Sequence, residues 1–437
     1  MIILKNLKNV FFVSELRKKV LFTLGVIIVF RLGHYIPVIG VDVLKLQQFM
    51  TQATKLGSLF SYLDVFSAGS LATCTLFALG VGPYITASIM MQILGFTIPE
   101  LEQLSKEGEF GKRIINQYTR YLALGLSIMY SSAYAVALEA HGLVIDPGWK
   151  FRFLFVLSLS VGCMAVMWLG EQISLFGIGN GSSMLIFVGI VARFPEYVIK
   201  TIHFVQTGQL DMVLGFFIWM LLIAIIACII FLEKGDRKIP VQYARRVMGN
   251  RVFGGQSTFI PFKINAAGVM PIIFTGSILG IFSGLIIMLA EKFKFFSSIS
   301  SMLASDGLLF NVIQFIMIVL FYYVYTSLVF NPVELADNIK KSGGFIPGLR
   351  PGRKTAEFFN HILTRLGLVG AAYLAILAMI PNIMPLFITM PFILQGTSLL
   401  IMVGVGMDTV AQLESYLIEH NYEGFLSSGR LKQRGAR

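Results

Sequence analysis

The sequence predicts an all-α membrane protein that crosses the bilayer about ten times. Hydrophobic residues make up 56% of the chain and charged residues only 13%, whereas a soluble domain of this length needs a more polar surface. Apolar segments of roughly 20 residues recur along the chain, and Lys and Arg collect between alternate pairs of them. Lipid is therefore expected to be the solvent for most of the chain.

Each span is predicted as a helix, because lipid offers no partner for unpaired backbone polar groups. The predicted spans are residues 20–38, 75–96, 118–138, 151–170, 178–194, 212–232, 266–289, 308–330, 362–380 and 390–407. The first span has the basic start and apolar run of a signal peptide, but Arg31 and His34 follow in place of a small-residue cleavage site. We therefore predict that this span is retained as a membrane helix.

The basic residues set the predicted orientation. Most of the 35 Lys and Arg residues lie outside the spans, and these are divided about three to one between the two sides, which predicts a cytoplasmic N-terminus and a cytoplasmic C-terminus. A net charge of +12 is also compatible with a nucleic-acid partner. Basic cytoplasmic loops account for the charge more simply.

Two long cytoplasmic loops, residues 233–265 and 331–361, carry much of this charge. In the first, short β-prone runs flank Gly249-Asn250, which predicts a protruding hairpin. The second contains the run FIPGLRPG, a turn stiffened by Pro and Gly that presents Arg350.

A semi-apolar segment at residues 57–74, on the outer side, is too short to cross the bilayer. Asp64 and Gly69 interrupt its apolar character. It is either a half-helix that enters the membrane beside a cavity or an amphipathic surface loop, and its residues alone do not separate these interpretations.

The sequence carries little that indicates catalysis or a cofactor. The histidines lack metal-ligand spacing, and the three cysteines, interpreted as small core residues, are Cys74, Cys163 and Cys228. The run GVGMD ending at Asp408 is similar to a motif of intramembrane aspartyl proteases, but no second intramembrane Asp pairs with it. The run GIGNG at 177–181 lacks the lysine of a phosphate loop, so we predict a tight turn into the fifth span.

Ionisable residues within the spans are few, and Arg31, His34 and Glu171 lie close to span ends. A proton- or sodium-coupled transporter would carry more of them. An inverted-repeat solute transporter and an intramembrane hydrolase are two functions to be weighed for such a protein.

Several long motifs identify a resemblance to the SecY family, the large subunits of bacterial Sec protein-conducting channels. They stand in this order: FALGVGPYITASIMMQIL (77–94), GEQISLFGIGNG (170–181), RRVMGNRVFGGQSTFIPFKINAAGVMPIIF (245–274), KKSGGFIPGLRPGRKT (340–355) and GTSLLIMVGVGMD (396–408). The resemblance implies a channel that moves unfolded secretory proteins across the bacterial inner membrane and releases transmembrane segments sideways into the lipid. It also implies that the chain is not an enzyme.

The resemblance implies two inverted five-helix halves around a central pore, with a plug half-helix in the outer funnel. The expected divisions are a cytoplasmic segment 1–19, a first half 20–194, an external connection 195–211, a second half 212–413 and a tail 414–437.

The family's functional residues can be carried over to matching positions. The implied pore ring is Val81, Ile85, Ile186, Ile273 and Ile401. Ser182 stands where relatives often have an aliphatic residue. The implied lateral-gate residues are Thr86 and Ile281. The implied plug residues are Asp64, Phe66, Gly69, Leu71 and Cys74.

The resemblance also implies partners. The expected ones are the small subunit SecE, SecG, the motor ATPase SecA or a translating ribosome, an unfolded polypeptide with its signal sequence, and membrane lipid. The basic loops would dock SecA or the ribosome, through Arg245, Arg246, Arg251 and Arg350.

Overall fold

The computed structural model describes residues 13–42, 45–46, 73–140, 142–243, 246–248, 251–253, 257–276, 278–279, 308–387 and 396–433. Long helices dominate these residues. The chain divides into two compact units, Met1–Glu196 with Ile401–Arg437, and Tyr197–Leu400.

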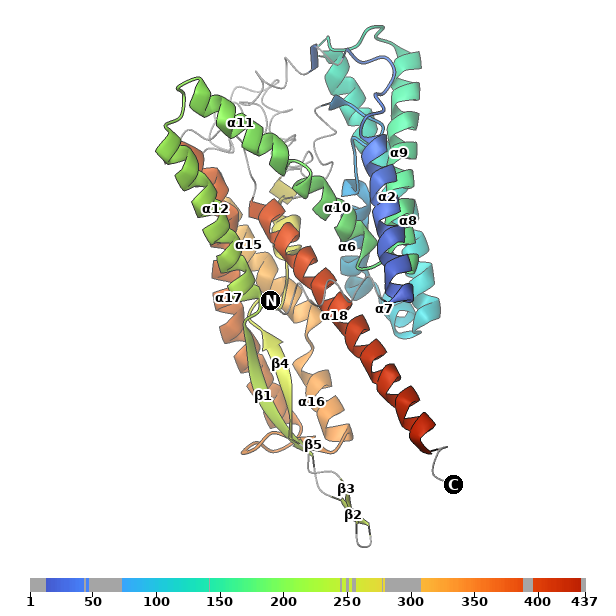
Figure 1. The fold of residues 1–437 in the computed structure, drawn as a ribbon, viewed down its shortest axis with the longest axis vertical. Helices are drawn as coiled ribbons and strands as arrows, with labels where there is room; N and C mark the ends of the chain where they lie inside the picture. The colour runs from blue at the N-terminus through green and yellow to red at the C-terminus, as the bar shows by residue number, and fades with distance from the viewer. Residues whose placement is uncertain are drawn as a thin grey trace. The chain divides into compact units, whose positions relative to one another are not determined.

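The first unit is a group of helices packed around α9. Its elements are α2 Ser14–Gly33, α6 Gly82–Thr97, α7 Pro99–Lys106, α8 Glu109–Ala140, α9 Trp149–Phe176, α10 Gly181–Val191 and most of α18 Gly396–Gln433. Helix α8 packs against both α6 and α9, and α9 also packs against α2 and α10 (Figure 1). Helix α11, Phe194–Gln206, passes from this unit into the second.

The second unit combines membrane helices with a small sheet. Its elements are α12 Met212–Glu233, β1 Asp236–Tyr243, β2 Arg246–Met248, β3 Arg251–Phe253, β4 Ser257–Lys263, α15 Leu308–Val329, α16 Pro332–Lys341, β5 Gly344–Phe345 and α17 Arg353–Phe387. Helix α15 packs against α17, and α16 packs against the start of the same helix. Strands β4, β1 and β5 form an antiparallel sheet in that order, beside α12 and α17 (Figure 1).

Among the described residues, seven helical segments are long and apolar enough to cross a membrane. The most apolar of them is α12, whose mean hydropathy reaches 3.0. The chain is therefore a multi-pass membrane protein. The predicted spans 212–232 and 308–330 coincide with α12 and α15 to within one residue at each end. The predicted total of ten spans stays a prediction, because residues 280–289 of span 266–289 lie outside the described residues.

The predicted end of the first span is wrong by five residues. Helix α2 ends at Gly33, and the chain continues in non-helical backbone to Val38. Pro37 and Thr75 form an isolated antiparallel bridge, and the Val38 N–H donates to the carbonyl of Cys74 at 3.0 Å. Backbone pairing across the chain therefore replaces the last turn of the predicted helix.

The predicted start of the second span is also wrong. Helix α6 begins at Gly82, because Gly80 takes a left-handed conformation at φ 52° and Pro83 favours the first turn of a helix. The result is a helix of only 16 residues, preceded by turns at 76–81.

The fifth and tenth spans differ from prediction at their ends. Helix α10 stops at Val191, since a turn at 192–193 separates it from α11. The predicted external connection 195–211 is therefore largely helical. Helix α18 continues to Gln433, so the predicted tail 414–437 is mostly a continuation of the last span.

The sheet of the second unit buries one of its faces on α17. Ile239, Val241 and Phe262 are almost fully buried, and the rings of Phe262 and Phe359 lie 5.5 Å apart. Short alternating strands with one apolar face are typical of an antiparallel sheet on a helix. This sheet was absent from the sequence prediction.

The hairpin predicted around Gly249-Asn250 is confirmed. Strands β2 and β3 pair antiparallel with Met248 opposite Arg251, which leaves a two-residue connection between them. The hairpin projects beyond the three-stranded sheet (Figure 1).

Candidate channel and partner-binding sites

Two of the predicted pore residues lie at the start of α6. Val81 precedes the first helical residue and is 1% exposed, while Ile85 is half-buried. The Ile85 N–H donates to the Val81 carbonyl at 3.0 Å, so the two side chains stand one turn apart on the same face. Gly80 and Pro83 set the start of α6 and thus the positions of Val81 and Ile85.

Two more of the predicted pore residues belong to helices that lie side by side. Ile186 of α10 and Ile401 of α18 are both buried. A Cβ atom added at Gly406 would meet the Phe187 ring at 3.9 Å, so the two helices touch just beyond these residues. The first unit therefore brings α10 and α18 together.

Ile273, the fifth predicted pore residue, belongs to the second unit. It lies in a helical stretch at 270–276 and is 8% exposed, between the buried residues Ile272 and Phe274. Because the five residues are divided between two units, their assembly into one ring stays a prediction. The backbone of Ser182 lies against Gly170 of α9.

Thr86, a predicted gate residue, lies on α6, which packs against α8. Its hydroxyl donates to the Gly82 carbonyl at 3.1 Å, within the same helix. The second and third predicted spans therefore pack together within the first unit. Ile281 lies outside the described residues.

Of the predicted plug residues, Cys74 is described, and Asp64, Phe66, Gly69 and Leu71 lie outside the described residues. Cys74 is fully buried in an apolar cluster with Leu46 and Phe155. Its backbone is left-handed, at φ 49°, which is unusual for a residue other than glycine. The interpretation of the cysteines as small core residues is confirmed for Cys74 and Cys163, which are buried, and is wrong for Cys228, which is exposed.

The turn around Arg350 is anchored by apolar side chains. Ile346 is 5% exposed and Leu349 packs against the same cluster, which includes Phe359 of α17. The Thr355 hydroxyl donates to the Arg350 carbonyl at 3.1 Å. These anchors leave Arg350 itself exposed. The turn can therefore present a guanidinium group in a fixed direction.

The other predicted docking arginines belong to the hairpin or its approach. Arg246 lies in β2 and Arg251 in β3, at opposite ends of the paired region. Arg245 lies outside the described residues.

An ion pair that the sequence analysis missed joins α8 to α9. Arg120 donates twice to the Glu171 carboxylate, with both distances at 2.8 Å. Two opposite charges near corresponding ends of neighbouring spans were the available signal. The separation of 51 residues hid the contact from local patterns.

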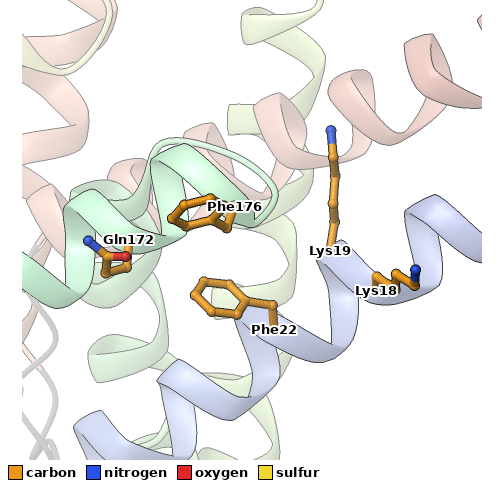
Figure 2. Close-up of a pocket in the computed structure, with 5 residues that line it drawn as sticks. All are labelled: Lys18, Lys19, Phe22, Gln172 and Phe176. Atoms are coloured by element: carbon orange, nitrogen blue, oxygen red, sulfur yellow. The ribbon is translucent and has the colours of Figure 1, made fainter.

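An open pocket of about 450 Å³ lies between α2 and α9. It is lined by Lys18, Lys19, Phe22, Gln172 and Phe176 (Figure 2). The Phe22 and Phe176 rings meet edge to face, with their centroids 5.8 Å apart. The pocket contains no predicted site residue. Across the described part of the chain, no group of three or more His, Cys, Asp or Glu is placed to hold a metal.

Comparisons with known proteins agree on one family. The SecY family matches residues 75–410. A protein translocase subunit SecY from Thermus thermophilus is 42% identical and covers 97% of each chain. The same subunit from Escherichia coli K12 is also 42% identical, over 97% of this chain and 96% of its own length.

Solved structures share the fold. One described as "The structure of a protein conducting channel" superposes with a TM-score of 0.63 at 19% identity, covering 91% of this chain and 92% of its own. A second, of Sec61 in a canine ribosome-channel complex, has a TM-score of 0.58 at 18% identity, with the same coverage.

Proposed function

This chain belongs to the SecY family, and on that basis we propose that it forms the channel of a bacterial protein translocase. Unfolded secretory proteins cross the membrane through it, and transmembrane segments leave it sideways into the bilayer. The observation that carries this proposal is 42% identity to a translocase subunit over 97% of both chains. The named relatives and structures are translocase subunits or protein-conducting channels, so the transporter alternative has no support from them.

The predicted ring supplies the physical basis of the channel. Aliphatic side chains offer an ion nothing in exchange for its hydration shell, so a narrow ring of them excludes ions. The same side chains are flexible and apolar, and they can close around an extended polypeptide of any sequence. Burial of Val81, Ile186 and Ile401 in the first unit supports their placement away from lipid.

The lateral exit is proposed to open beside α6. Thr86 and Ile281 face each other across it, and weak polar contacts keep it only marginally closed. The packing of α6, which carries Thr86, against α8 supports this placement. The plug, residues 64–74, blocks the outer side of the resting pore.

The channel is proposed to lie in the inner membrane with both termini in the cytoplasm. The distribution of Lys and Arg supports this orientation. The proposed halves are residues 20–194 and 212–413, in inverted orientation, with segments 1–19 and 414–437 in the cytoplasm and 195–211 outside.

The energy for transport is proposed to come from partners, and the chain itself acts as a channel and not as an enzyme. SecA or a ribosome docks on the cytoplasmic loops through Arg350 and the hairpin arginines, while SecE and SecG complete the membrane complex. The ribosome-channel complex of Sec61 supports the ribosome as one partner. Exposure of Arg350 on an anchored turn supports its role in docking.

Protease protection in proteoliposomes tests the proposal. The full chain is reconstituted with SecE and SecG, and an unfolded secretory protein is added with SecA and ATP. We expect the secretory protein to become resistant to external protease only when SecA and ATP are both present. Failure of protection with a verifiably inserted complex, together with uptake of small solutes, would reject the proposal.

A further inference from the structure

The turn at 177–181 has no role in the function proposed so far, yet its backbone is held by three other parts of the first unit. The Ile178 N–H donates to the Thr23 hydroxyl of α2 at 3.1 Å, and this bond is buried. The Gly179 N–H donates to the Gln412 side-chain oxygen of α18 at 2.9 Å. The Gly181 N–H donates to the Ser174 hydroxyl of α9 at 2.8 Å. Side chains from three helices thus accept from one short turn.

The turn is also seated too closely for larger residues. A Cβ atom at Gly181 would lie 1.8 Å from the Gly170 carbonyl oxygen, and one at Gly177 would lie 2.5 Å from the Thr23 hydroxyl. Both distances are far below van der Waals contact. The glycines therefore allow the backbone of the turn to rest directly on α9 and α2.

Apolar and aromatic contacts reinforce the same junction. Ile178 is 4% exposed and packs with Leu16 of α2 and with Leu413 and Leu417 of α18. The Lys19 ammonium group lies 4.2 Å from the centre of the Tyr416 ring, a cation–π contact between the same two helices.

The turn leads directly into the helix that carries a predicted pore residue. Asn180 caps α10 by accepting from the Ser183 N–H at 3.4 Å. Ile186 lies only five residues beyond the first helical residue, Gly181, or about 8 Å along the axis. Because α10 is 11 residues long, the seat of its first turn determines where Ile186 stands.

We propose that Thr23, Ser174 and Gln412 are positioning residues for the pore, because they lock the turn at 177–181 in the seat that places Ile186 in the closed ring. This inference rests on the proposed channel function and deepens it. When the lock is intact, the three acceptors satisfy the N–H groups of Ile178, Gly179 and Gly181. Loss of an acceptor leaves a backbone N–H unpaired, which reduces the free energy that favours the position of Ile186 in the closed ring.

The three acceptors should differ in importance according to burial. Thr23 is 5% exposed, and its hydroxyl also donates to the Lys19 carbonyl at 2.9 Å, so both of its hydrogen-bonding capacities are used. The bond from Ser174 is partly buried, and the bond from Gln412 is exposed to solvent. Water replaces an exposed acceptor more readily than a buried one, so the expected order of effect is Thr23, then Ser174, then Gln412.

The test is the resting ion conductance of the full chain, reconstituted with its membrane partners in planar bilayers. Thr23→Val removes the acceptor with almost no change in side-chain volume, while Thr23→Ser keeps it. We expect Thr23→Val to raise the resting conductance on the order of tenfold, and Thr23→Ser to stay near the unmodified channel. Ser174→Ala and Gln412→Leu should give progressively smaller increases.

Thr119→Val is the matched control for general damage. Thr119 is 4% exposed, and its hydroxyl donates to the Ile115 carbonyl at 2.8 Å, as that of Thr23 donates one turn back. It lies on α8, outside the contacts of the turn. The proposal is overturned if Thr23→Val is as silent as Thr119→Val, or if both leak equally.

Ile186→Gly separates this inference from the channel function on which it rests. If Ile186→Gly leaks and Thr23→Val does not, the ring stands and the lock is rejected. If neither leaks, the assignment of Ile186 to the ring fails as well. A leak in both, with Thr119→Val silent, supports the lock.

Discussion

Two glycine-rich turns, at 177–181 and at 345–352, are held in opposite ways. In the first, side chains from α2, α9 and α18 accept from the backbone of the turn. In the second, the turn's own Ile346 is buried, Leu349 is partly buried, and Arg350 is left exposed. The first arrangement holds the backbone of the turn against the helices of its own unit. The second presents one charge outward. Similar composition thus supports an inward role in one turn and an outward role in the other.

The largest effect is expected at Arg350, where a substitution should impair partner docking and leave the ion seal unchanged. Arg350→Glu should reduce partner-dependent translocation by roughly 10- to 100-fold, because a charge-assisted contact is replaced by repulsion. Its resting ion conductance and melting temperature should match those of the unmodified channel. Translocation rates with SecA and with ribosomes measure the effect. Retention of both rates would show that the exposed charge is ordinary surface.

The glycines of the two turns should respond differently to alanine. Gly181→Ala places a Cβ atom against the backbone of α9 and should cost about 1–3 kcal/mol with an increase in ion leakage. Gly348 has φ 83° and open space where its Cβ would stand, so Gly348→Ala should cost only about 1 kcal/mol of backbone strain.

Thermal unfolding of the purified complexes gives the order of stability for these two variants. Leakage in planar bilayers tells whether the strain reaches the pore. A greater loss of stability in Gly348→Ala, or leakage in that variant alone, would contradict the difference drawn between the turns.

Thr355→Val tests the turn at 345–352 in the way that Thr23→Val tests the turn at 177–181. It removes the hydrogen bond to the Arg350 carbonyl while preserving side-chain volume. We expect partner affinity to fall by roughly two- to tenfold through loosening of the turn, with no increase in resting conductance. Equilibrium binding of SecA to the reconstituted channel measures it. An increase in resting ion conductance in Thr355→Val would contradict the expectation that this turn acts on partner binding alone.

The smallest effect is expected at Lys354, next to the same turn. Lys354 and Glu357 are 3.2 Å apart but largely exposed. Lys354→Gln should therefore change stability by less than about 0.5 kcal/mol, and partner binding should stay unchanged. A loss of binding as large as that of Arg350→Glu would mean that total charge, and not the direction of Arg350, determines docking.

The sequence predicted features with local signals. Long apolar runs located α12 and α15, and Gly249-Asn250 between β-prone runs located the hairpin. The early end of α2 was missed because it depends on pairing between Pro37 and Thr75, which are distant in the chain. The sheet was missed because the apolar face of β1 is buried by α17, a contact between segments distant in the chain.

The candidate sites also include features that the sequence predicted and features that depend on contacts between distant segments. Family motifs gave the positions of the predicted pore residues, and burial of Val81, Ile186 and Ile401 agrees with a role away from lipid. Periodicity could not predict that Thr23 accepts a bond from Ile178, since 155 residues separate them. The turn at 177–181 was predicted, but its three partners follow only from the packing of whole helices.

The most direct test of the channel is single-channel conductance of the full complex, with and without the ring. The variant carries Gly at positions 85, 186, 273 and 401 in place of Ile. The account predicts that the unmodified channel is silent at rest and that the variant conducts ions. Equal silence of both, with the folded complex verifiably inserted, would contradict the assignment of these residues to the seal.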